Sequence, residues 1–261
     1  MLTTTILFAS GLGIGALGTL IGAGGGWMIV PILLLGFGFT PQQAAGTSLA
    51  VVFLNAFSGS IAYMVQRRVL YAMGIAFAAA SVPGALLGAW LVQYLDPRAF
   101  SVLFGCLLLV IAIILHRGKH LVLFQSTWER VGSARLQSFR SPMMCLGIFV
   151  SFFVGVLSSL FGVGGGIIHV PFLIMVLGLS VHTATATSQF VLAITSLTGS
   201  LVFLRQGQIH LTAAASMGLG VMIGAQGGAW LSTRLTGEPI RRILAAALGI
   251  FALRMILRFA F

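Results

Sequence analysis

A glycine-rich segment at residues 22–31 recurs at residues 162–171, with four glycines, a valine and a proline in identical positions. Each copy contains Gly-x-Gly-Gly-Gly, and a glycine inside a helix costs about 1 kcal/mol relative to alanine. Both copies therefore predict a break in a helix. Since both lie inside long apolar stretches, we expect the breaks at membrane depth, where unpaired backbone groups must be buried in protein or face a wet cavity.

The composition around these breaks is typical of a membrane protein. The chain of 261 residues is 59% hydrophobic and 7% charged, and its mean hydropathy is +1.11. Several stretches of about twenty apolar residues are long enough to cross a bilayer core. They are continuously apolar rather than alternating, which excludes a membrane β-barrel. We expect an all-α polytopic protein of the bacterial inner (cell) membrane, in contact with lipid.

The formal net charge is +11. The basic residues lie in short loops between apolar segments, as the positive-inside rule predicts, and this excludes nucleic acid as a partner. Cys106 and Cys145 lie in apolar segments without a CxxC spacing, so neither a disulfide nor a metal site is expected. No cofactor is expected, and the sequence predicts no particular oligomeric state.

Ten apolar segments alternate with polar intervals along the chain. Two of them, 27–38 and 167–178, follow the glycine runs and are too short to span a membrane alone. The polar interval 116–141 is the longest and is basic, which predicts a cytoplasmic linker between transmembrane repeats at 1–115 and 142–261. The other segments are expected near 5–21, 43–65, 70–93, 99–115, 143–161, 182–204, 210–231 and 241–257.

The repeat continues beyond the glycine runs at the same spacing. Ala-x-x-Thr-Ser occurs at residues 44–48 and again at 184–188. A chance repeat would not keep its register through four segments, so two pseudo-symmetric halves with glycine-broken or re-entrant helices are expected, as in many secondary transporters. Further matches are Gly-Ser at 59–60 and 199–200, Gly84 with Gly224, and Gly-Ala-Trp-Leu at 88–91 and 228–231.

The relative orientation of the halves follows from where the loop arginines lie. If each broken pair enters and returns on one side, the repeats are inverted, and Arg234, Arg241 and Arg242 are cytoplasmic while Arg205 is outside. If each broken pair is one kinked span, the repeats are parallel and these positions are reversed. The inverted arrangement keeps more arginine inside, so it is the one that we expect.

On these residues the chain resembles the TauE/SafE family of sulfite and organosulfur anion transporters, over nearly its whole length. The resemblance rests on the duplicated Gly-x-Gly-Gly-Gly-(x)4-Pro, the two Ala-x-x-Thr-Ser motifs, and Pro83-Gly84 followed by Gly88. Ile223 replaces the proline in the second copy. The resemblance implies transport of a small anion such as sulfite, thiosulfate, a sulfonate or a related organic acid. It does not select among these anions or between export and uptake.

Two kinds of groups in these motifs suit an anion. An unwound glycine run exposes backbone amides, and the helix after it presents a positive N-terminus; close helix packing is the alternative use of small residues. The hydroxyl and amide side chains that follow can donate to an oxyanion or bond back to their own helix. The expected anion-binding residues are Gly24, Gly25, Gly26, Thr47, Ser48, Asn55, Gly164, Gly165, Gly166, Thr187, Ser188 and Gln189.

His169 follows the second glycine run, where the first copy has Ile29. An ionisable residue at membrane depth is a functional candidate, so we interpret His169 as a proton-coupling residue, with a neutral histidine bonded to a carbonyl as the alternative. Asp96, Glu129 and Glu238 all lie in loops. Cation pumps usually need carboxylates inside the membrane, so their absence from the spans favours an anionic substrate.

Together these features predict a secondary transporter, not an enzyme, that moves a small anion by alternating access of two halves. The chain has no P-loop, so ATP is not its direct energy source. An anion channel is the alternative. An intramembrane hydrolase with Ser158 or Ser159 as nucleophile and His169 or His210 as base is disfavoured, because the glycine motif repeats in a half that lacks His169.

Overall fold

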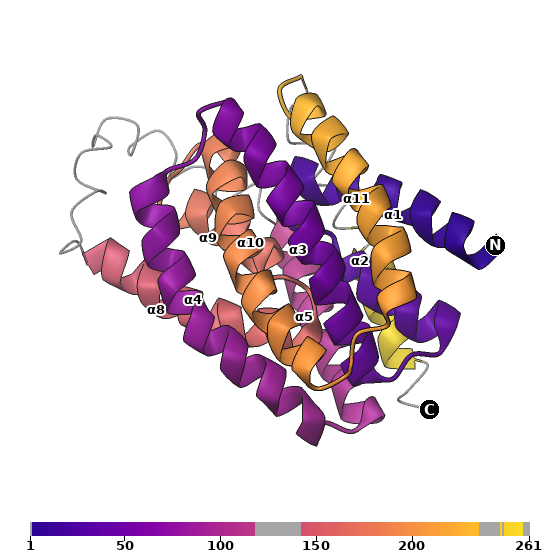
Figure 1. Ribbon diagram of the computed structural model, residues 1–261. Coiled ribbons are helices and arrows are strands. Elements are labelled where there is room, and N and C mark those ends of the chain that lie inside the picture. Colours follow the sequence, from indigo (N-terminus) through magenta and orange to yellow (C-terminus); the bar gives the residue numbers. More distant parts are fainter. Residues whose placement is uncertain (1, 118–141, 235–245, 247, 258–261) are drawn as a thin grey trace.

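The computed structural model describes residues 2–117, 142–234, 246 and 248–257. The described residues form helices and no strands, and six of these helices are long and apolar enough to cross a membrane (Figure 1). This confirms the prediction of an all-α polytopic membrane protein. Residues 118–141, which make up most of the expected linker, and residues 241–245 of the last expected segment lie outside the described residues.

The helix bounds agree with the predicted apolar segments to within a few residues. The first half contains α1 (Leu2–Ile21), α2 (Gly26–Pro31), the π-helical turn η1 (Ile32–Gly36), α3 (Pro41–Val65), α4 (Tyr71–Leu91), the 3-10 turn η2 (Val92–Tyr94) and α5 (Pro97–Arg117). The second half contains α8 (Pro142–Phe161), α9 (Gly166–Met175), α10 (Val181–Arg205), α11 (Leu211–Leu231) and a short helix at Leu248–Leu257.

Equivalent caps begin the two longest helices, α3 and α10. The Thr40 hydroxyl accepts from the Gln43 backbone N–H, and the Gln43 side chain accepts from the Thr40 N–H, which completes a capping box before Pro41. The Ser180 hydroxyl accepts from the Thr183 N–H in the same way at the start of α10. Each cap satisfies amides that have no partner within the helix, so the short helix before it ends in a defined turn.

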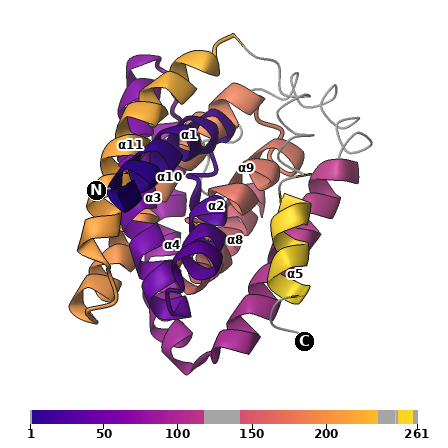
Figure 2. The same ribbon diagram turned by 90° about the vertical axis from the view of Figure 1, so that its right-hand side faces the viewer.

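The two halves are packed into one another rather than side by side. In both views α1 lies along α11, and α4 lies along α8 (Figures 1 and 2). Glycines bring the backbones of each pair together, as small residues do between membrane helices. Residue numbers rise together along each contact, so the helices of a pair are parallel. The contacts are Gly84 with Phe152, Gly88 with Val156, Gly224 with Leu12 and Gly228 with Ala16.

At the centre of the molecule, α3 and α10 lie beside each other in opposite directions (Figure 1). Gly199 meets Leu49 near one end of the contact, and Gly59 meets Gln189 near the other. Because α3 and α10 are equivalent in the repeat, two equivalent elements are antiparallel partners. Their contacts are reciprocal, as across an isologous two-fold interface.

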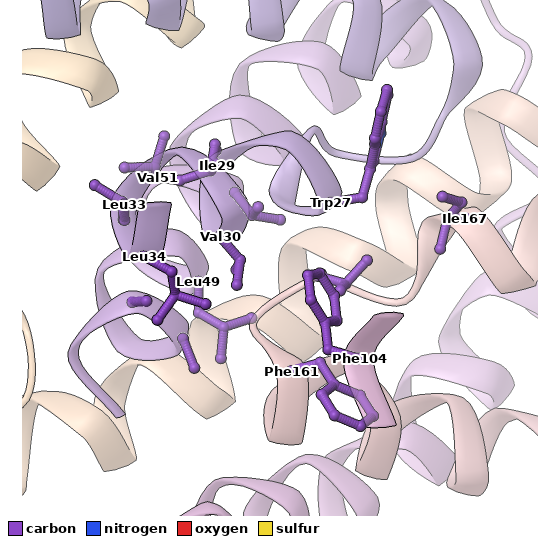
Figure 3. Packing of buried hydrophobic residues seen from close by; sticks show 14 of the residues in the cluster. Trp27, Ile29, Val30, Leu33, Leu34, Leu49, Val51, Phe104, Phe161 and Ile167 are labelled. Carbon is purple, nitrogen blue, oxygen red and sulfur yellow. The ribbon is translucent and has the colours of Figure 1, made fainter. Parts of the chain in front are cut away.

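A hydrophobic cluster holds the short helices of the first half inside the protein. Trp27 from α2 and Leu33 from η1 are buried, and they pack near Leu49 of α3 and Phe104 of α5 (Figure 3). The rings of Phe104 and Phe161 lie with their centroids 5.6 Å apart. A helix too short to span the bilayer is therefore surrounded by protein rather than lipid, as a broken backbone requires.

The packing of α11 against α1 predicts opposite effects for two neighbouring glycines. A Cβ added at Gly228 would collide with the backbone of Ala16, whereas one added at Gly227 would meet no atom within 4 Å. We expect Gly228→Ala to destabilise the protein by about 1–3 kcal/mol through overpacking. Gly227→Ala, the matched control, should leave the melting temperature of the detergent-solubilised protein unchanged or slightly raised. Equal melting temperatures for the two variants would contradict this packing.

Candidate functional site

Both glycine runs are non-helical where the sequence predicts a break. Residues 22–25 and 162–165 form two loops, which we call the first and second glycine loops, and Gly26 and Gly166 begin the helices that follow. Gly25 and Gly165 have φ angles of 83° and 73°, in the left-handed region. A side chain in that region costs roughly 1–2 kcal/mol, so the conformation of both loops selects glycine.

The two glycine loops touch each other at the centre of the molecule. A Cβ added at Gly26 would lie 2.5 Å from the Gly162 carbonyl oxygen, and one at Gly166 would collide with the Gly22 carbonyl oxygen. Gly24 and Gly164 both pack against Val52 of α3 and Leu192 of α10. The loops therefore meet between the two antiparallel helices.

One serine connects each glycine loop to the opposite half. The Ser48 hydroxyl donates to the Gly162 carbonyl at 2.7 Å, and the Ser188 hydroxyl donates to the Gly22 carbonyl at 3.2 Å. Both serines are fully buried. Unwinding frees these carbonyls from helical bonds, and in the membrane they need a partner inside the protein. The serine of the repeated Ala-x-x-Thr-Ser motif supplies that partner.

The threonines of the same motif lie on helix starts of the opposite half rather than on the glycine loops. Thr47 Oγ1 accepts from the His210 N–H at 3.0 Å, just before α11 begins. Thr187 Oγ1 accepts from the Leu70 N–H at 3.2 Å, just before α4 begins. The predicted set therefore separates into residues at the loops and residues that position neighbouring helices.

A small cavity lies beside the second glycine loop. It has room for about one water molecule. Gly165 precedes α9 without any side-chain cap, so the first amides of this ten-residue helix carry its positive end toward the loop. Three hydroxyl groups from other helices also line the cavity. Ser188 donates to the Gly22 carbonyl, and Ser81 and Thr195 are bonded to each other and to their own helices, so each has to exchange a partner to bind a ligand. The lining residues are Ser81, Val154, Gly164, Gly165, Gly166, His169, Ser188, Val191, Leu192 and Thr195.

His169 lines this cavity and is buried. Its Nε2 lies 3.1 Å from the Ser151 hydroxyl oxygen, and that hydroxyl donates to the Gly147 carbonyl at 2.7 Å. Because a hydroxyl has one proton, the network assigns the donor role to His169 Nε2–H. The histidine therefore bonds to a hydroxyl, and not to the carbonyl that the alternative interpretation supposed.

Polar residues from both halves form a separate network beside the first glycine loop, and they do not line the cavity. Asn55 Nδ2 donates to the Gly24 carbonyl at 3.2 Å, and Asn55 Oδ1 accepts from the Thr19 hydroxyl at 3.1 Å. Gln189 Nε2 donates to the Thr19 hydroxyl oxygen at 3.2 Å. The Tyr63 hydroxyl donates to the Thr19 carbonyl at 2.9 Å. Thr19, Asn55 and Gln189 thus connect α1, α3 and α10.

Sequence reasoning did not select Thr19, Ser81 or Ser151. Ser81 is buried, and its hydroxyl lies 2.5 Å from that of Thr195. Thr19 is equivalent to Ser159 in the repeat. The hydroxyl group present at both positions is the sequence feature from which Thr19 could have been predicted. Ser151 and Ser81 have apolar or glycine counterparts, Gly11 and Val221, and the repeat gave no indication of them.

The serines considered as nucleophiles are not paired with a histidine in the part of the chain that the structure describes. Ser158 and Ser159 are buried, and their hydroxyls have no hydrogen-bond partner within the described residues. His169 bonds Ser151 instead, and His210 caps α11 by accepting from the Ala213 N–H. A nucleophile needs a base within hydrogen-bond reach, so this arrangement does not favour a hydrolase.

Comparison with known proteins shows that the chain is similar to membrane transporters. The model of the family described as Sulfite exporter TauE/SafE matches residues 7–255. The probable membrane transporter protein YunE of Bacillus subtilis (strain 168) is 30% identical, over 96% of this chain and 96% of its own length. The probable membrane transporter protein MJ0441 of Methanocaldococcus jannaschii is 26% identical, over 98% and 97%. A search of solved structures gave no match.

The role of the second glycine loop in transport can be tested with one substitution and a matched control. Gly165→Ala forces a side chain into a left-handed residue and places its Cβ 2.8 Å from Val154, beside the cavity. Gly207→Ala imposes the same backbone strain at a φ of 68° with no atom within 4 Å. We expect Gly165→Ala to lower anion flux per folded protein more than tenfold, and Gly207→Ala to stay near the wild-type flux. Equal flux in the two variants would remove the loop from the site.

Proposed function

We propose that this chain, which belongs to the Sulfite exporter TauE/SafE family and is a membrane transporter, carries a small anion across the cell membrane by alternating access. The substrate class is sulfite, thiosulfate, a sulfonate or a related organic acid. The observation that carries the proposal is the meeting of two glycine loops in a buried site lined by hydroxyl groups and the positive end of α9.

The electrostatics of this site favour a negative ligand. The N-terminus of α9 contributes about half a positive charge, and Ser81, Ser188 and Thr195 line the cavity with hydroxyl groups. Asp96 is the one acidic residue among those that the structure describes, and it is exposed at the start of α5, where it accepts from the Ala99 N–H. No described carboxylate therefore opposes an anion in the cavity.

We assign the primary anion contacts to the second glycine loop and Ser188. Gly164, Gly165 and Gly166 lie at the N-terminus of α9, and they line the cavity together with Ser188. Their counterparts at the first loop are Gly24, Gly25, Gly26 and Ser48. We propose that these residues contact the anion when the other half opens. Thr47 and Thr187 would act indirectly, since they hold helix starts. His169 remains the proposed proton-coupling residue, because it lines the cavity.

Transport requires this site to open. The cavity holds about one water molecule, which is less than sulfite needs, so the loops have to separate before an anion can enter. The bonds from Ser48 to Gly162 and from Ser188 to Gly22 join the loops to opposite halves. Breaking one bond and keeping the other would expose the site to one side at a time. This is how two reciprocal halves support alternating access.

We also infer that the repeats are inverted in the membrane. The equivalent helices α3 and α10 are antiparallel and both are candidate spans, so a two-fold axis that relates them is perpendicular to the spans. Such an axis lies in the plane of the membrane. The parallel pairing of α1 with α11 and of α4 with α8 agrees with the same axis.

Flux measurements in reconstituted vesicles test the proposed function. We expect saturable uptake for at least one of sulfite, thiosulfate, sulfoacetate and simple carboxylates, with stimulation by the same anion on the opposite side. Ser188→Ala should weaken the apparent affinity about fivefold, as the loss of one net hydrogen bond of about 1 kcal/mol predicts. Ser48→Ala should have a smaller effect, because Ser48 does not line the cavity.

Ser216→Ala is the control, since within the described residues the Ser216 hydroxyl bonds only to its own helix, through the Thr212 carbonyl. Its apparent affinity should equal that of the wild type. Flux that rises linearly with concentration and shows no stimulation from the opposite side would indicate a channel. An unchanged affinity in both Ser188→Ala and Ser48→Ala would remove the hydroxyls from the site.

Labelling at two equivalent loop positions tests the inverted arrangement. Arg67 follows α3 and Gly207 follows α10, and both have left-handed backbones. With Cys106 and Cys145 replaced by serine, Arg67→Cys and Gly207→Cys each provide one thiol. We expect a membrane-impermeant reagent on intact cells to label position 207, and to reach position 67 only after the membrane is opened. Labelling of both positions from the same side would rule out inverted repeats.

A further inference from the structure

A buried polar network beside the first glycine loop points to a ligand other than the anion. Its side chains are Thr19, Asn55 and Gln189, and each has 0% of its surface exposed. They come from α1, α3 and α10 and form a chain of hydrogen bonds, which Asn55 joins to the carbonyl of Gly24 in the first glycine loop. Neutral polar groups at this depth are costly unless every donor and acceptor has a partner.

The hydrogen bonds determine which way each amide points. The Gly24 carbonyl can only accept, so Asn55 must present its Nδ2 there and its Oδ1 to Thr19. The Thr19 hydroxyl donates its one proton to Asn55 Oδ1 and can only accept from Gln189. Gln189 must therefore present Nε2 to Thr19. This leaves Gln189 Oε1 as a fully buried acceptor without a hydrogen-bond partner within the described residues. Exchanging the oxygen and nitrogen of Gln189 would satisfy fewer groups.

The chemistry of the network suits a cation of single charge. An acceptor without a donor attracts a cation rather than an anion, and Thr19 lies in the last turn of α1, at the negative end of that helix. Neither hydroxyl nor amide groups titrate near neutral pH, so a proton is not the natural ligand. No carboxylate among the described residues is near enough to balance a divalent ion, because Asp96 is exposed at the start of α5.

The network occurs once, although the repeat provides two equivalent places for it. At the positions that the repeat makes equivalent, Ser159 takes the place of Thr19, Thr195 that of Asn55, and Leu49 that of Gln189. Ser159 has no hydrogen-bond partner among the described residues, and the Thr195 hydroxyl bonds Ser81 and its own helix. A fold that tolerates leucine at one of two equivalent positions does not need glutamine at the other, so packing alone does not account for Gln189.

We propose that Thr19, Asn55, Gln189 and the Gly24 carbonyl form a Na⁺ site. The ligands are four neutral oxygens: Gln189 Oε1, Asn55 Oδ1, Thr19 Oγ1 and the Gly24 carbonyl oxygen. The Thr19 hydroxyl can turn its proton away from Asn55, which frees an oxygen lone pair without any backbone movement. Unwound carbonyls and the C-terminal ends of broken helices hold coupling ions in other transporters, whereas N-terminal ends hold anions.

This site would couple Na⁺ to the anion that the proposed function assigns to the second glycine loop. The ion would bind the Gly24 carbonyl and so fix the first loop against α3 and α10. Gly26, two residues later, contacts the Gly162 carbonyl of the second loop. Na⁺ would therefore stabilise the contact between the loops and, with it, the neighbouring anion site. The positive ion would also offset the charge of the anion during transport.

The test measures the melting temperature of the purified protein in Na⁺ and in K⁺ at equal ionic strength. A ligand that binds only the folded protein raises the melting temperature, and we expect a rise of about 2–4 °C in saturating Na⁺ for the wild type. Gln189→Leu, which copies Leu49, and Asn55→Thr, which copies Thr195, should abolish the rise. Gln42→Leu, at the start of α3 and about 20 Å along that helix from Asn55, removes a bond to the Val92 carbonyl and should retain the rise.

Each outcome decides the proposal. Equal melting temperatures of the wild type in Na⁺ and K⁺ would overturn it, and so would a rise that survives in both Gln189→Leu and Asn55→Thr. If one of these variants does not fold, the other still decides. A parallel measurement with sulfite separates the two proposals: a Na⁺ shift without a stabilising effect of any anion in the panel would contradict the proposed function and leave the Na⁺ site standing. A rise in melting temperature with an anion but not with Na⁺ would contradict the Na⁺ site and leave the proposed function standing.

Discussion

The structure depends on one constraint, which is that a backbone unwound inside a membrane needs hydrogen-bond partners from the protein. Breaking a helix at residues 22–25 and at 162–165 frees carbonyls that water cannot reach. Ser48 and Ser188 satisfy two of them, and each serine belongs to the half opposite the loop that it stabilises. The breaks are therefore possible only because the two halves interlock, and the interlocking explains why the serine motif is duplicated together with the glycines.

The same reciprocity relates the fold to the proposed mechanism. Each glycine loop lies against the middle of α3 and α10, so a movement of one half against the other changes both loops together. The chemical environments of the two loops nevertheless differ. His169, Ser81 and Thr195 surround the second loop, whereas Thr19, Asn55 and Gln189 surround the first. We infer that duplication of the repeat produced the two halves that move against each other. Differences in a few side chains then made one loop bind the anion and the other bind the coupling ion.

Much of this architecture could be predicted from the sequence, and the limits have physical causes. Apolar length located the helices, and the energetic cost of glycine located both breaks. The assignment of Thr47 and Thr187 could not be refined, because a hydroxyl that contacts a loop and one that caps a distant helix look the same in sequence. Asn55 was predicted among the anion-binding residues, and the structure buries it. Its partner Thr19 was missed, because their contact joins α1 to α3 and no local pattern records it.

The central claim is that the anion binds at the second glycine loop, and crystals of the protein grown with selenite would test it most directly. Selenite is a heavier analogue of sulfite, and anomalous scattering at the selenium edge locates it without ambiguity when the protein carries ordinary methionine and Cys106 and Cys145 are replaced by serine. The account predicts a selenium peak beside the second glycine loop, with the selenite oxygens within hydrogen-bond distance of the Gly165 amide and the Ser188 hydroxyl. A selenium peak found only outside these loops, for example at the loop arginines Arg67 and Arg205, would contradict it.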